Sequence, residues 1–297
     1  MDELRVADRP ELTKPVLVAA FRGWNDGGQA ASLAGGYLAK QWAAARFADI
    51  DPENFYDFQV TRPQVSLVDG VTRKLDWPDN AFYHAHLGEA GRDAVVFLGI
   101  EPNTRWRTFT QLIVALAADL EIELVITLGA LLADVPHTRP APVTGSASDP
   151  KLVDELGLQT SRYEGPTGIV GVLHDACKAI GLPSVMLWAA VPHYVSLAPS
   201  PRGALALCQR LGKVLNVSID TGELEEASER YAEQVSEAVS GDADTAAYVE
   251  ELEQRVDTIE ELDLPSGDTI AAELTRFLRE REEGEDESPP DVARGEQ

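Results

Sequence analysis

The chain has 297 residues, of which 50 are acidic and 25 basic, so its formal net charge at pH 7 is −25. Hydrophobic residues make up 44% of it, which is enough to bury an ordinary globular core without disulfides or metals. A field this negative repels phosphate backbones and anionic headgroups, so we expect no nucleic acid and no membrane as partner.

Several features favour a cytoplasmic protein. Cys177 and Cys208 form no C-x-x-C pair and no metal-ligand pattern, so we interpret them as buried thiols, which are typical of a reducing compartment. Residues 1–14 are too polar for a signal peptide. The longest uncharged stretch, 179–201, contains four prolines and predicts a strand and loops rather than a membrane span.

Strand and helix patterns alternate along most of the chain. Continuous apolar runs predict buried strands at 15–21, 94–100, 123–129 and 184–191. Such runs indicate strands that are covered on both faces, as in a parallel sheet. Helices are predicted at 29–45, 105–120 and 169–180. The alternation predicts an α/β fold in three layers with a mostly parallel central sheet.

A different pattern lies between the first two of these strands. In the segment Val65–Leu75, an Asp69-Gly70 turn separates two short strand-like runs, which predicts a β-hairpin. We expect residues 81–87 to join this hairpin in a small antiparallel insert or sheet edge.

The C-terminal quarter is helical and acidic, because residues 219–297 hold 26 acids and only 6 bases. Apolar residues recur every three or four positions on both sides of Ser240-Gly241-Asp242, which predicts an antiparallel helical hairpin. Its acidic outer face is either a solvated surface or a surface for another subunit or a client. The predicted parts are a body at 1–218, the helical hairpin at 219–262, a short helix at 263–279 and a disordered acidic tail at 280–297.

Polar residues follow the ends of the four predicted strands. In open α/β sheets, ligands bind beyond the carboxyl ends of the strands, so these residues are candidates for a cleft or an interface. They are Trp24, Asn25, Asp26, Gly27, Gly28, Glu101, Arg105, Arg107, Asp134, His137, Arg139, His193 and Tyr194.

These residues have three interpretations. In an enzyme, the two histidines could supply an acid and a base, the arginines could hold an anion, and the Gly27-Gly28 turn could expose N–H groups to a phosphate. They could instead bind a ligand or peptide, or simply hold loops together. Because no nucleophile, nucleotide or metal-ligand pattern is present, we assign no catalytic residue, no metal and no cofactor. Trp24, Trp106 and Trp188 are expected to anchor the core or loops.

Six ordered segments resemble the bacterial branch of the proteasome assembly chaperone 2 family. The first reads Phe21-Arg-Gly-Trp-Asn-Asp-Gly-Gly28, and the others lie at 75–78, 101–107, 128–140, 163–169 and 187–194. The resemblance implies a phosphorylase/hydrolase-like α/β fold, self-association and ATP-independent help in proteasome assembly, and it carries over no catalytic residue. Some archaeal relatives dock a C-terminal hydrophobic-Tyr-any residue motif into the proteasome ring. This sequence ends Arg294-Gly-Glu-Gln297, so we expect no docking of that kind.

The leading hypothesis is therefore a non-enzymatic protein-binding module that forms homo-oligomers, with proteasome subunits as candidate clients. The alternative is a small-molecule-binding protein or enzyme with a phosphorylase-like cleft built on His137, His193, Arg107 and Arg139. A third hypothesis is that the strand-end loops form the homo-oligomer interface itself.

Overall fold

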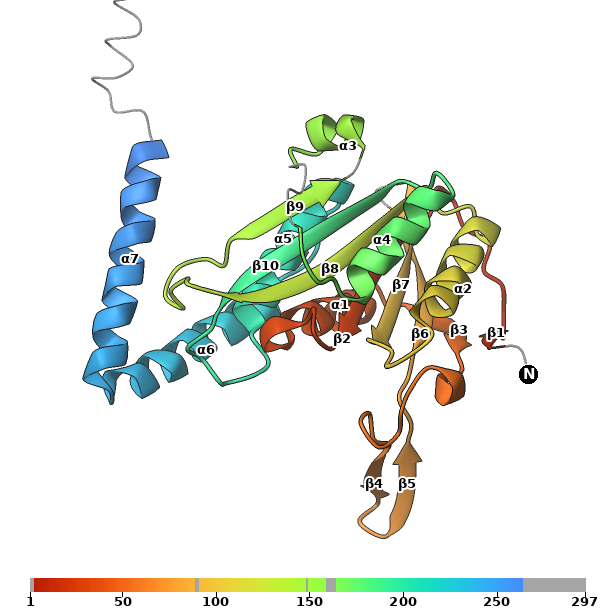
Figure 1. The fold of residues 1–297 in the computed structure, drawn as a ribbon, viewed down its shortest axis with the longest axis horizontal. Helices are drawn as coiled ribbons and strands as arrows, with labels where there is room; N and C mark the ends of the chain where they lie inside the picture. The colour runs from red at the N-terminus through yellow and green to blue at the C-terminus, as the bar shows by residue number, and fades with distance from the viewer. Residues whose placement is uncertain (1–2, 89–90, 148, 159–163, 264–297) are drawn as a thin grey trace, which may run out of the picture. The chain divides into compact units, whose positions relative to one another are not determined.

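A mixed eight-stranded sheet organises the computed structural model, which describes residues 3–88, 91–147, 149–158 and 164–263 (Figure 1). The described residues divide into two units, the first ending at Ala246 and the second beginning at Ala247. In spatial order, the strands of the sheet are β1 (Leu4–Val6), β3 (Ala45–Ile50), β6 (Ala81–Leu87), β7 (Arg92–Ile100), β2 (Val16–Arg22), β8 (Leu124–Ala133), β10 (Ser184–Pro192) and β9 (Val143–Ala147). The helices are α1 (Ala30–Gln41), α2 (Trp106–Asp119), α3 (Pro150–Glu155), α4 (Ile169–Ala179), α5 (Pro201–Leu215), α6 (Gly222–Ser240) and α7 (Ala243–Asp263).

The centre of the sheet is parallel. β7, β2, β8 and β10 run in one direction, and they are the four strands that the apolar runs predict. Every residue from Val16 to Phe21 is buried, because helices cover both faces of the sheet. The outer strands β6, β3, β1 and β9 are antiparallel to their neighbours. The mostly parallel centre is confirmed, and its parallel strands end at one common edge, which we call the carboxyl edge.

Each face of the sheet has its own hydrophobic core. α1 and α5 cover one face, and α2 and α4 cover the other, which confirms the three-layer α/β fold (Figure 1). In the α2/α4 core the Phe97 ring lies 4.5 Å from the Phe82 ring and 5.2 Å from the Phe21 ring, between centroids. Cys208 lies in one core and Cys177 in the other, and burial raises the pKa of both thiols to about 12.

The segment between β3 and β6 differs partly from the prediction. The β-hairpin is present as β4 (Gln64–Val68) and β5 (Thr72–Asp76), with Asp69 and Gly70 at φ angles of 53° and 72°. These left-handed angles place both residues at the centre of a β-turn that the Val71 N–H closes on the Val68 carbonyl oxygen (3.2 Å). The expected pairing of residues 81–87 with this hairpin is wrong, because β6 lies between β3 and β7 in the main sheet.

The helix predicted at 29–45 also ends early, at Gln41. Ala43 has a φ of 47°, which turns the chain into β3. The sequence Ala45–Ile50 mixes polar and apolar residues without a clear period, and strand β3 therefore escapes prediction.

α6 and α7 occupy the range predicted for the helical hairpin, on either side of residues 241–242. α6 packs against α5 and buries Leu224, Tyr231 and Val235. The short helix predicted up to residue 279 and the tail at 280–297 fall outside the described residues. Within the described ranges, no helix combines the length and apolar character needed to cross a membrane.

Candidate functional site

The carboxylate of Glu101 organises the loops at the carboxyl edge. Its Oε1 accepts hydrogen bonds from the Asn25 side-chain amide (3.2 Å) and the Ile169 backbone N–H (2.8 Å). Its Oε2 accepts one from the Trp24 backbone N–H (3.1 Å). Gly168 lets these groups approach, since a Cβ there would lie 2.2 Å from the Asn25 amide nitrogen. Glu101 thus fastens the loops after β2 and β7 to the start of α4.

Asp26 caps helix α1 from the loop after β2. Its Oδ1 accepts hydrogen bonds from the backbone N–H groups of Ala31 (2.8 Å) and Ser32 (3.1 Å). These are donors that a phosphate at the Gly27-Gly28 turn would need, and the chain's own carboxylate already occupies them. Burial raises the pKa of Asp26, although these hydrogen bonds oppose the shift, and its Oδ2 is buried without a hydrogen-bond partner.

Asp26→Asn is expected to gain stability relative to wild type as the pH rises. The folded chain holds the Asp26 proton more tightly than the unfolded chain, so wild-type stability falls as the pH rises from 3.8 through the folded-state pKa. Asn cannot ionise and keeps one capping oxygen, whereas Asp26→Ala should lose about 1–2 kcal/mol with the cap. Urea unfolding at about pH 4 and about pH 7 measures this. If the free energies of unfolding of Asp26→Asn and wild type differed by the same amount at both pH values, the prediction would be contradicted.

His137, in the loop after β8, is a buried junction with only 1% of its surface exposed. Its backbone N–H donates to the Tyr194 hydroxyl (2.8 Å), and its Nδ1 lies 2.8 Å from the same oxygen. Its Nε2 lies 2.9 Å from the Ser236 hydroxyl on α6. Both ring nitrogens therefore make contacts that hold the strand-end loops and α6 together.

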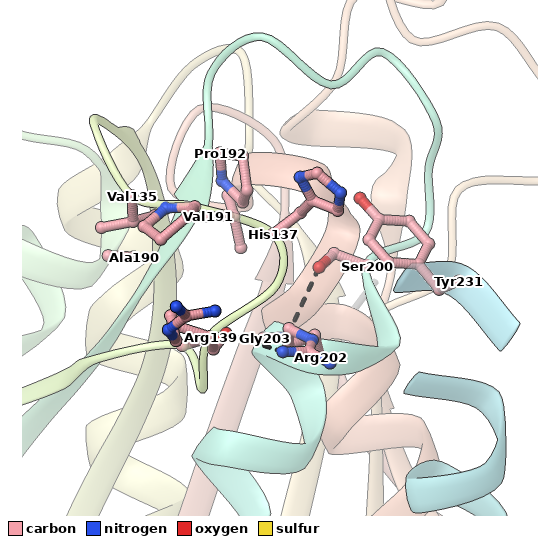
Figure 2. Close-up of a pocket in the computed structure, with 12 residues that line it drawn as sticks. Val135, His137, Arg139, Ala190, Val191, Pro192, Ser200, Arg202, Gly203 and Tyr231 are labelled. Carbon is pink, nitrogen blue, oxygen red and sulfur yellow. Dashed lines mark hydrogen bonds between the residues drawn. The ribbon is translucent and has the colours of Figure 1, made fainter. Parts of the chain in front are cut away.

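A small cavity lies beside His137, with Arg139, Arg202 and Tyr231 in its lining (Figure 2). The Arg202 guanidinium donates to the carbonyl oxygen of Arg139 (2.7 Å). The cavity has about 10 Å³ of free space, the room of one water molecule. Small-molecule sites are typically about 300–1,000 Å³, so this cavity is too small for a substrate.

Apart from His137 and Arg139, the candidate side chains do not line this cavity. The His193 imidazole lies 3.2 Å from the Asp134 carboxylate. Arg105 pairs with Glu3 (2.6 Å) and covers the Phe55 ring. The structure therefore brings His137 and Arg139 to one cavity, and His193, Arg105 and Arg107 do not line it.

A shallower depression of about 350 Å³ lies on the α1 side of the sheet. Its lining includes Arg22, Tyr83 and Asp79, and it includes none of the candidate residues named from the sequence. Asp79 is already paired with Arg46 (2.9 Å). Among the described residues, no three His, Cys, Asp or Glu side chains group as metal ligands.

The carboxyl edge also exposes three apolar side chains, two of which are successive residues of β8 and point to opposite faces of the sheet. They are Trp24, Leu131 and Leu132, with 65%, 44% and 58% of their surfaces exposed. The loop of Trp24 runs beside the end of β8, where the Ala130 N–H donates to the Asn25 carbonyl (2.9 Å). Trp24 does not lie in the core, so of the two expected roles only that of a loop anchor stays a prediction for it, while Trp106 and Trp188 pack against the α2/α4 core as expected.

The model of the PAC2 family matches residues 20–239. This chain belongs to the PAC2 family. The match confirms the resemblance read from the six segments. No curated protein matches this PAC2 chain.

Solved structures give the same assignment. A PAC2 family protein from Streptomyces avermitilis is 48% identical, with a TM-score of 0.74 over 79% of this chain and 99% of that one. A proteasome-assembly chaperone homologue from Mycobacterium tuberculosis is 46% identical, with a TM-score of 0.72 and the same two coverages. An archaeal proteasome activator from Pyrococcus furiosus shares only the fold, at 18% identity and a TM-score of 0.64 over 80% of this chain and 99% of that one.

Some residues at the PAC2 carboxyl edge escape sequence-based prediction. Ser236 is a lone serine on a helix, a pattern that indicates only solvent exposure. Tyr231 belongs to the predicted apolar stripe of α6, which indicates burial but not its place beside His137. Ser200 and Arg202 lie at the start of α5. They line the cavity because α5 packs against β10, which the sequence does not predict.

Proposed function

We propose that this PAC2 protein is a non-enzymatic, ATP-independent binding factor for proteasome subunits during assembly. The observation that carries the proposal is that polar side chains at the carboxyl edge bond within the chain while apolar side chains there are exposed. Glu101, Asp26 and His137 are engaged in internal hydrogen bonds there. Trp24 and Leu132 are exposed at the same edge. Exposed apolar side chains of this kind are typical of protein interfaces, and tryptophan is enriched among the residues that dominate binding.

The choice of partner rests on the relatives. The Mycobacterium tuberculosis protein that is 46% identical to this chain is described as a proteasome-assembly chaperone homologue. ATP independence is supported by the capping of α1 by Asp26, which uses helix N-terminal donors that a phosphate would need. A cytoplasmic location is supported by the two unpaired cysteines, since free thiols persist in a reducing compartment.

Reconstitution with the proteasome α and β subunits of the same organism tests the proposal. The chain should form a complex with unassembled subunits, and core particles should appear faster on native gels whether or not ATP is present. Bovine serum albumin at equal concentration serves as the crowding control. An unchanged assembly rate with no complex would remove the proposed function, and a requirement for ATP would remove its ATP-independent part.

A further inference from the structure

The small cavity beside His137 is lined by basic residues and by no acidic residue (Figure 2). Its 12 lining residues include Arg139 and Arg202, and none of them is an aspartate or glutamate. The chain as a whole has the opposite balance, with 50 acidic and 25 basic residues. Ser200 and Gly203 place the start of α5 at the same cavity, and the N-terminus of a helix is its positive end. The lining therefore supplies positive charge and no counter charge of its own.

The Arg202 side chain leaves this positive charge uncompensated. Its Nη1 donates to the Arg139 carbonyl oxygen (2.7 Å), whereas its Nε is buried and has no hydrogen-bond partner among the described residues. No described carboxylate pairs with the guanidinium, and burial lowers the pKa of Arg202, which the neighbouring Tyr231 partly opposes. A guanidinium that is withdrawn from water without a counter-ion is costly, so an anion beside it would stabilise the fold.

Arg210, on the same helix, provides a comparison. Its Nη2 donates to the carbonyl oxygens of Leu156 (3.2 Å) and Gly157 (2.7 Å), and its Nε is also buried without a partner. Arg210 does not line the cavity. A buried Nε therefore does not mark a site by itself, and Arg202 differs in lying beside a space that can hold an ion.

The size of the cavity limits what can enter it. Its free space of about 10 Å³ has the room of one water molecule, so phosphate, sulfate and carboxylates are too large. A water molecule could accept the Nε–H of Arg202, but it brings no charge. Chloride is only slightly larger than water, and it both accepts hydrogen bonds and supplies the missing negative charge.

We propose that one chloride ion occupies this cavity beside the Arg202 guanidinium and fastens α6 to the start of α5. Tyr231 of α6 lines the same cavity, so an ion there contacts both helices. Because the site exists only in the folded chain, bound chloride stabilises the fold by mass action. The inference is independent of the proposed function, since the exposed Trp24 and Leu132 do not line the cavity.

Chlorine nuclear magnetic resonance tests the site on the intact chain. Wild type should broaden the chloride signal in a saturable way, because a chloride ion bound to a slowly tumbling protein relaxes quickly. Bromide should displace the ion, whereas gluconate is too large to do so. Arg202→Gln keeps an amide donor without the charge and should reduce the broadening roughly 10-fold or more. Arg210→Gln is the matched control and should keep the wild-type value.

Thermal unfolding measures the expected stabilisation. At equal sodium concentration, replacing gluconate by chloride should raise the midpoint of wild type by about 2–4 °C more than that of Arg202→Gln. The comparison with the variant removes the general effect of salts on burial. Equal changes in the two proteins would overturn the proposal.

A wild-type crystal grown in bromide locates the ion even if Arg202→Gln does not fold. Its anomalous scattering should peak beside the Arg202 Nε. The absence of a peak there, or of saturable broadening in wild type, would mean that the cavity holds water only and would overturn the proposal. Broadening that survives Arg202→Gln, or that Arg210→Gln removes equally, would also overturn it.

Discussion

Glu101→Ala is expected to lower the free energy of unfolding by about 2–4 kcal/mol. The substitution removes the acceptor of three hydrogen bonds, from Trp24, Asn25 and Ile169. Asn25 is only 3% exposed, so its amide would lose this partner where water has little access. Urea unfolding followed by circular dichroism measures the loss, and amide exchange at Ile169 should show that the start of α4 loosens.

Glu101→Gln removes the negative charge and keeps one acceptor oxygen, so it distinguishes the contribution of the charge to stability from that of the hydrogen bonds. Glutamine keeps one carbonyl oxygen, which can still bond Asn25 and Ile169, so the expected loss is about 1–2 kcal/mol. If the free energy of unfolding of Glu101→Ala lay within about 0.5 kcal/mol of the wild-type value, the Glu101 carboxylate would not be what holds these loops together.

His137→Ala is expected to cost a similar amount, about 2–4 kcal/mol, through a different element. It empties a buried position and leaves the Tyr194 and Ser236 hydroxyls without their ring partner. Because the ring joins the loop after β8 to α6, the loss of stability should be greatest in α6. Amide exchange should therefore accelerate around Tyr231 and Val235 more than in the central strands.

Ser236→Ala is the matched control for the contact with α6. It removes one hydrogen bond and leaves the His137 ring in place, so the expected loss is below about 1 kcal/mol. Equal losses for His137→Ala and Ser236→Ala, or unchanged exchange in α6, would contradict the role of the ring.

The sequence by itself determined the layers of the fold. A run such as Val16–Phe21 has no polar residue to face water, so it is a strand covered on both sides wherever it pairs. The Asp69-Gly70 turn is equally local, because two adjacent residues that accept left-handed angles are sufficient to close a hairpin. The sequence also located Glu101 and His137 at the carboxyl edge, since strand ends lie where apolar runs stop.

The tertiary structure alone decided what those edge residues do. The partners of Glu101 are 68 to 77 residues away, and Ser236 lies 99 residues from His137, so no local pattern specifies either contact. The same holds for β6, whose place beside β7 depends on long-range pairing, and for Trp24, whose exposure depends on what the folded chain leaves uncovered. Periodicity reports whether a residue faces a core, whereas pairing and exposure depend on which distant segments arrive next to it.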